Sequence, residues 1–105
     1  MNSNKKFHLQ LENEAVVGAV LKGIAKFKNP LPIALTNGIF VIQGPGLEEK
    51  LEYLLPNVLE VGAESTFQFS MTPQYEETTL VIANFHAKEL SGAYGSAMVT
   101  VTNKA

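Results

Sequence analysis

The side chains best suited to acid–base or metal chemistry in this sequence are two histidines and two acidic pairs. The two histidines are His8 and His86, and the acidic pairs are adjacent glutamates at positions 48–49 and 76–77. Imidazole nitrogens and carboxylate oxygens bind metal ions or move protons when several converge on one point. Each histidine falls in a segment with the pattern of a strand, where a lone histidine is ordinarily a surface residue. The two glutamates of a pair would not converge either, because adjacent strand residues face opposite ways. We therefore predict no metal site and no catalytic residue.

Three lysines and a Gly-Pro-Gly run are the next candidates for a binding site. Lys22, Lys26 and Lys28 share one face of a predicted strand. There they would either contact an anion weakly or form a charged edge that discourages sheet-to-sheet aggregation, and we favour the edge. The Gly-Pro-Gly run at 44–46 precedes neither a Lys-Ser/Thr pair nor a helix, so it predicts a turn rather than a phosphate loop. No cofactor-binding residue is predicted.

The absence of four residue types narrows the chemistry further. The sequence contains no Cys, Trp, Arg or Asp. Without Cys there is no thiolate nucleophile, disulfide or zinc–thiolate site, and without Asp an EF-hand loop or a Ser-His-Asp arrangement loses a required member. Without Arg there is no bidentate clamp for a phosphate group. A small independent hydrolase is therefore the weakest of the function classes considered.

Length and composition predict one soluble globular domain covering residues 1–105. The chain is 46% hydrophobic and 17% charged, which provides enough apolar material for a single core. No stretch approaches the roughly 20 apolar residues of a membrane helix, and the start lacks the apolar centre of a secretory signal. Residues 1–5 are expected to be a flexible start. A net charge of −2 with scattered lysines favours neither nucleic acid nor a membrane as a partner.

Apolar and polar residues alternate over several short segments, which is the pattern of half-buried strands. The alternation is clearest where Phe67 begins a run of three apolar and three polar residues. Several of the segments are also rich in β-branched residues, which favour strands. The seven predicted strands cover residues 7–12, 19–28, 35–43, 48–54, 67–72, 78–86 and 97–102.

Turn residues separate these strands at most of the required places. An Asn-Pro pair at 29–30 ends one strand, the run at 44–46 makes a hairpin-like corner, residues 56–63 form a longer crossing, and residues 90–95 supply the last turn. Residues 88–91 form at most a single helical turn. Seven short strands with a turn about every ten residues are typical of an all-β, immunoglobulin-like sandwich with Greek-key connections.

Without a disulfide, apolar packing alone must hold the two sheets together. Segment 78–86 is apolar on both faces up to Asn84, which predicts a central strand whose outer face is partly covered. The expected core consists of Phe27, Leu35, Phe40, Phe67, Phe69, Val81, Phe85, Val99 and Val101.

Five markers occur in a fixed order along the chain. They are F-K-N-P-L-P at 27–32, L-T-N at 35–37, G-P-G-L at 44–47, the crossing at 56–64 and V-I-A-N-F at 81–85. Together, over about residues 20–102, they resemble the C-terminal β-barrel of the transglutaminases. Many members of that family place a Cys after the L-T-N run, where this chain has Gly38. That residue is not catalytic in the family, so the assignment is little affected.

The resemblance implies that the chain is a noncatalytic part of a protein-glutamine γ-glutamyltransferase. In this family, a Cys-His-Asp site on a central domain forms a thioester with glutamine and passes it to a lysine amine, and activity depends on calcium. Two C-terminal barrels cover that site in a closed form and swing away on activation; this chain resembles the second. It is therefore expected to hold no cofactor, to pack on other domains of its parent enzyme and to limit access to the catalytic core.

Two arrangements remain open for Leu31, Pro32 and Ile33: an exposed apolar knob that contacts a neighbouring domain, or a plug tucked under the sandwich. The alternative function is a free-standing or tandem immunoglobulin-like module of an adhesion or cell-surface protein, which would bind a protein partner through a strand edge or loop. An uncovered face would also allow the isolated domain to self-associate. Cytoplasmic and extracellular localisation both stay open.

Overall fold

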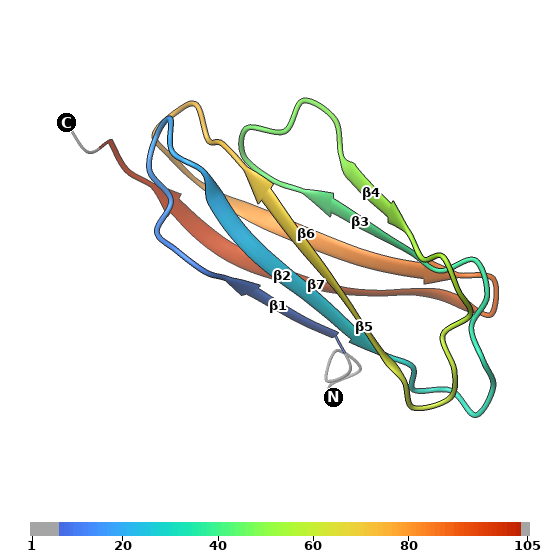
Figure 1. Ribbon diagram of the computed structural model, residues 1–105. Helices are drawn as coiled ribbons and strands as arrows, with labels where there is room; N and C mark the ends of the chain where they lie inside the picture. The colour runs from blue at the N-terminus through green and yellow to red at the C-terminus, as the bar shows by residue number, and fades with distance from the viewer. Residues whose placement is uncertain (1–6, 104–105) are drawn as a thin grey trace.

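Within residues 7–103, alternating side chains place seven strands in two antiparallel sheets that pack face to face (Figure 1). The computed structural model describes residues 7–103, so the start predicted to be flexible at 1–5 lies outside the described residues. Among residues 7–103, no helix has the length and apolar character needed to cross a membrane. The strands are β1 (Phe7–Leu11), β2 (Leu21–Lys28), β3 (Ile39–Gln43), β4 (Leu51–Leu54), β5 (Glu64–Met71), β6 (Glu77–Ala87) and β7 (Leu90–Val101).

The predicted immunoglobulin-like sandwich is confirmed by the strand order. The first sheet has the order β1-β2-β5 and the second the order β4-β3-β6-β7. The chain crosses from one sheet to the other after β2, after β4 and again after β5. Strand β6 lies between β3 and β7, as its two apolar faces predicted.

Two of the predicted strands begin three or four residues too early, and the strand predicted at 67–72 begins three residues too late, since β5 starts at Glu64. Strand β3 begins at Ile39 instead of residue 35, because Leu35 pairs with Leu59 of the crossing in an isolated bridge and Asn37 has a positive φ of 57°. Such a left-handed residue turns the chain and interrupts an extended segment. Strand β4 begins at Leu51 instead of residue 48.

The turn predicted at residues 90–95 is also wrong, since these residues belong to β7. The hairpin between β6 and β7 turns at Lys88 and Glu89, which turn without forming a helix. Gly95 lies within the strand, opposite Ala83. A Cβ atom at Gly95 would lie 3.0 Å from the Phe7 ring, so this glycine marks a close approach between β7 and β1 and not a turn.

Three phenylalanines from both sheets form the centre of the core. Phe27 of β2 stacks on Phe85 of β6 with ring centroids 4.4 Å apart, and Phe40 of β3 meets Phe85 edge-on at 5.1 Å. All the expected core residues are buried except Phe67, which is half-buried and stacks on Tyr53 of β4 at 5.0 Å. That stack joins β4 to β5, which are edge strands of the two sheets. Buried apolar residues absent from the expected set include Phe7, Leu21, Ala25, Ile42, Leu59, Met71 and Ala83.

A buried asparagine side chain holds the corner that follows β2. Asn29 is 3% exposed. Its Nδ2 donates to the backbone oxygens of Ile33, Leu59 and Glu60 at 2.8, 3.1 and 3.2 Å, and its Oδ1 accepts from the Leu31 amide at 2.9 Å. The two prolines after it cannot donate backbone hydrogen bonds, so this side chain supplies the bonds that fix the corner to the crossing.

Replacing Asn29 is expected to destabilise the fold strongly. Asn29→Ala leaves one amide and three carbonyls without this partner, which should lower the free energy of unfolding by about 2–4 kcal/mol. Asn29→Asp keeps the shape but directs an acceptor at three carbonyl oxygens, so it should cost at least as much at neutral pH. Urea unfolding followed by circular dichroism measures both. The exposed Asn57→Ala is the control; a loss below about 1 kcal/mol for Asn29→Ala would contradict the assigned role.

Candidate functional site: the surfaces of the sandwich

The two histidines project from opposite sheets. His8 extends from β1 opposite Lys26, whereas His86 lies near the end of β6, where its Nδ1 is 3.1 Å from the Ser91 backbone oxygen. Both side chains are exposed. Within residues 7–103, no group of three or more His, Cys, Asp or Glu side chains is placed to hold a metal ion. The histidines therefore do not form a shared site.

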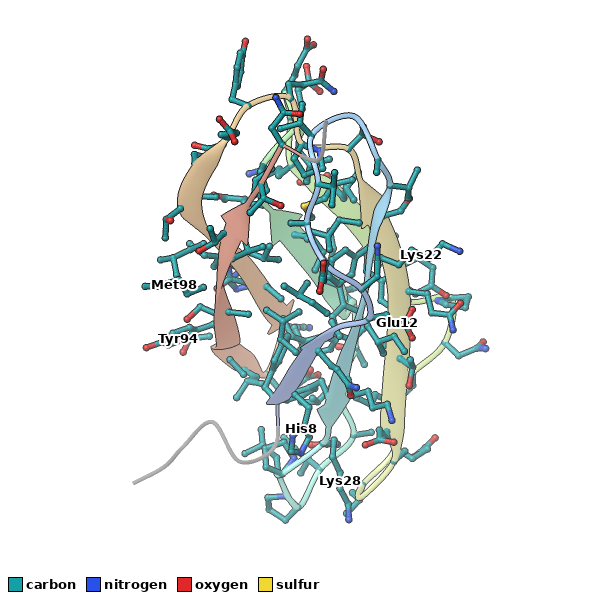
Figure 2. The ribbon with its side chains drawn as sticks, turned by 90° about the vertical axis from the view of Figure 1, so that its left-hand side faces the viewer. His8, Glu12, Lys22, Lys28, Tyr94 and Met98 are labelled. Atoms are coloured by element: carbon teal, nitrogen blue, oxygen red, sulfur yellow. The ribbon has the colours of Figure 1, made fainter. Side chains whose placement is uncertain are left out.

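The three lysines of β2 lie on the outer face of the first sheet. They project from β2, which pairs with β1 on one side and β5 on the other. The charged-edge interpretation of Lys22, Lys26 and Lys28 is therefore wrong, because their strand is central. Lys28 lies opposite Glu64 of β5, and Figure 2 shows Lys22 on the same side of the molecule as Glu12. Charges of both signs therefore share this face.

The outer face of the second sheet is more apolar. On it, Leu80 lies opposite Met98, and Asn84 lies opposite Tyr94. Met98 and Tyr94 are exposed over 73% and 54% of their surface and point away from the side that carries Lys22 and Glu12 (Figure 2). The sandwich thus has one face of mixed charge and one face with exposed apolar side chains.

The corner after β2 presents apolar side chains at one end of the sandwich. Leu31 is half-buried and packs against the core, whereas Pro32 and Ile33 are exposed. Leu31 is thus tucked in as a plug would be, whereas Pro32 and Ile33 are exposed as a knob would be. Because Asn29 binds backbone oxygens at 33, 59 and 60, the segment at 58–61 lies beside the corner.

Two valines of that neighbouring segment are exposed as well. Ile33, Val58 and Val61 are exposed over 52%, 46% and 57% of their surface. Pro32, Ile33, Val58 and Val61 are called the corner cap below. Strand β1 begins at this end, since Phe7 pairs with Phe27. The corner cap therefore lies close to the point where the described chain enters the domain.

An open groove of about 1150 Å³ lies at the other end, beside the start of β6. One wall is the loop between β3 and β4, with Glu48 and Glu49; Glu52 of β4 and Glu77 of β6 also line it, and Leu80 is among its apolar residues. This feature is called the acidic groove below. Sequence reasoning treated the pairs at 48–49 and 76–77 separately. Only the pairing of β3 with β6 brings the loop and the start of β6 together.

A carboxylate fastens the β6–β7 turn to the segment before β3. Glu89 accepts from the Thr36 amide and from the Thr36 hydroxyl, both at 2.7 Å, and the Lys88 amide donates to the Thr36 backbone oxygen at 2.9 Å. These bonds stabilise the charged carboxylate, with the backbone bond contributing most, so the pKa of Glu89 lies below its ordinary value. The contact is therefore stronger when Glu89 is ionised.

The chain is similar in sequence to part of several longer proteins. Annulin of Schistocerca americana is 36% identical over 87 residues, which are 83% of this chain and 11% of Annulin. The human protein-glutamine gamma-glutamyltransferase K is 34% identical over 98 residues, covering 89% of this chain and 11% of its own. No family model matches the chain.

The crystal structure of red sea bream transglutaminase superposes with a TM-score of 0.86 at 24% identity, covering 97% of this chain and 15% of that one. The chain is a transglutaminase homologue. It matches the C-terminal domain of these enzymes, so the resemblance indicated by the five sequence markers is confirmed. It spans 11–15% of the length of these transglutaminases. The corner cap and the acidic groove are thus surfaces of a transglutaminase-type domain.

Breaking the Glu89 contact should change how the stability of this domain varies with pH. The folded-state pKa is lowered, so the contribution of Glu89 is fully present above the unfolded pKa, about 4.3, and is lost as the pH falls through the folded value. Glu89→Gln is expected to lower the melting temperature at pH 7. It should also make the melting temperature decrease less steeply as the pH is lowered below about 4.3. Calorimetry at several pH values checks this. Glu60→Gln, an exposed control, should leave the profile unchanged; equal profiles for Glu89→Gln and wild type would contradict the role.

Proposed function

We propose that this chain is the noncatalytic C-terminal β-sandwich domain of a calcium-dependent, protein-crosslinking transglutaminase. In this proposal, it packs on the catalytic core, which lies outside the chain, and regulates access to it. The observation that carries the proposal is the match of most of this chain to a small share of much longer transglutaminases. Such coverage is what one domain of a multidomain enzyme would give.

The lack of suitable nucleophiles supports a noncatalytic role. The thioester chemistry that the resemblance implies needs a thiolate, and this chain contains no Cys and no Asp. Its two histidines project from different sheets, so neither can assist the other. Calcium is proposed to act through residues of the parent enzyme outside this chain.

The corner cap is the proposed contact with the preceding part of the enzyme. It exposes several apolar side chains on two neighbouring segments, and clustered apolar surface of this kind commonly marks an interface. It also lies at the end where β1 begins, so a domain joined ahead of β1 would reach it with a short connection. The hydrogen bonds of Asn29 would hold this surface in a fixed shape before docking.

The chain alone is expected to incorporate no amine into a glutamine-containing protein, with or without calcium. A labelled primary amine, a casein acceptor and the purified chain at high concentration provide the assay, with a full-length transglutaminase as positive control. Calcium-dependent incorporation that follows the chain through purification would contradict the noncatalytic assignment.

Charges in the corner cap should loosen the closed form of the parent enzyme. Ile33→Asp with Val61→Asp is expected to increase the radius of gyration in solution scattering, because two desolvated carboxylates oppose docking. Amine incorporation at limiting calcium should rise severalfold. Val20→Asp is the matched control, since Val20 is 50% exposed and lies before β2 at the opposite end. Unchanged scattering and activity in the double variant, with a normal melting temperature, would refute the corner cap as the contact.

A further inference from the structure

The acidic groove lies at the end of the sandwich away from the corner cap. The loop at 44–50 follows the last residue of β3, and β6 begins on the other side of the groove at Glu77. The corner cap instead adjoins the beginning of β3 and the end of β6, where the Lys88 amide bonds to Thr36. The groove would therefore stay accessible in a protein that docks through the corner cap.

The charge of the groove is one-sided. Its lining includes four carboxylates, from Glu48, Glu49, Glu52 and Glu77, and one ammonium group, from Lys50. The whole chain has a net charge of only −2, so the rest of the molecule is close to neutral. Like charges gathered around a concave surface produce a field that attracts a ligand of opposite sign.

Apolar side chains line the groove among these carboxylates. Leu80 is 43% exposed, Ile82 next to it on the same outer face is half-buried, and Tyr75 is exposed at the groove. A small cation would gain nothing from such surface. An apolar side chain placed on it would be partly removed from water, which is favourable.

The loop that forms one wall is held in place by close backbone packing. Gly46 has a φ of 85°, and a Cβ atom there would overlap the Thr72 backbone oxygen. A Cβ atom at Gly44 would lie 2.6 Å from the Met71 sulfur and 3.3 Å from a methyl group of Val81. Glycine is required at Gly46, so the base of this wall is fixed before a ligand binds.

We propose that the acidic groove binds a segment of a partner polypeptide in which an apolar side chain is flanked by lysine or arginine residues. The apolar side chain lies on Leu80 and Ile82, and the cationic groups face Glu48 and Glu49 on one wall and Glu77 on the other. A second copy of this chain fits less well, because its lysine-bearing face also carries carboxylates such as Glu64. The proposal is independent of the catalytic assignment above.

Binding of a designed probe to the full chain tests this proposal. The probe is a fluorescein-labelled peptide, Gly-Lys-Ser-Lys-Leu-Lys-Ser-Lys-Gly, followed by fluorescence anisotropy at about 50 mM salt, where screening is weak. Glu49→Gln with Glu77→Gln removes one charge from each wall and should weaken binding about three- to twentyfold. Leu80→Ser should weaken it about fivefold. A peptide with Ser in place of Leu should lose affinity for the wild type and little for Leu80→Ser.

The matched control removes two carboxylates from the other sheet. Glu12→Gln with Glu64→Gln changes the net charge equally and should alter the affinity less than twofold, because both residues lie outside the groove lining. If this control weakens binding as much as the groove variant, the attraction is nonspecific and the proposal fails. It also fails if the groove variant changes the affinity less than twofold.

The amide spectrum of the labelled chain supplies an independent readout. Peptide addition should shift ¹⁵N-amide signals of residues 43–52 and 75–82, and leave those of β1 and β2 unchanged. Shifts confined to β1 and β2 would overturn the proposal. Concentration-dependent shifts in the groove without peptide would show that a second copy is the occupant, and would overturn it as well.

Discussion

The stacking of Phe27 on Phe85 is the contact on which the two sheets depend. It joins the central strand of the first sheet to a central strand of the second, and Phe40 meets the same ring edge-on. The chain has no Cys, so no covalent bond shares this task. Losing one such ring costs about 3–5 kcal/mol, a large part of the roughly 5–15 kcal/mol that stabilises a domain.

The two ends of the sandwich differ because this core is closed in different ways. At one end, the Asn29 side chain and the Glu89 carboxylate fasten three segments with hydrogen bonds, and apolar residues remain on the outside. At the other end, the loop at 44–50 packs its glycines on the chain after β5 and leaves a groove beside β6. The first end suits docking of a rigid domain, and the second suits a smaller ligand.

Local sequence predicted most of the strands, because apolar residues alternate wherever one face of a strand points to the core. Prediction from local sequence failed where the role of a residue is set by a contact with a segment far away along the chain. Gly95 was predicted to lie in a turn, but its reason for being glycine is the close approach of Phe7. Lys26 was predicted to lie on an edge strand, but β5 pairs with β2 and makes β2 central. The acidic groove was missed for the same reason, since its glutamates at 48–49 and 77 are brought together by strand pairing. The corner motif was recognised, and the bond from the Leu31 amide to Asn29 Oδ1 is a local Asx turn, but the bonds of Asn29 to residues 59 and 60 join distant segments.

The hydrogen bonds of Asn29 also restrict how the chain length can vary. One amide group must reach backbone oxygens at 33, 59 and 60 simultaneously, so an insertion in either segment would pull an acceptor out of range. The exposed residues 48–50, beyond the packed glycines, have no such restraint among the described hydrogen bonds. Insertions and deletions should therefore accumulate beside the groove, and the corner should keep its spacing, so that related domains differ most in the shape of the end that carries the acidic groove.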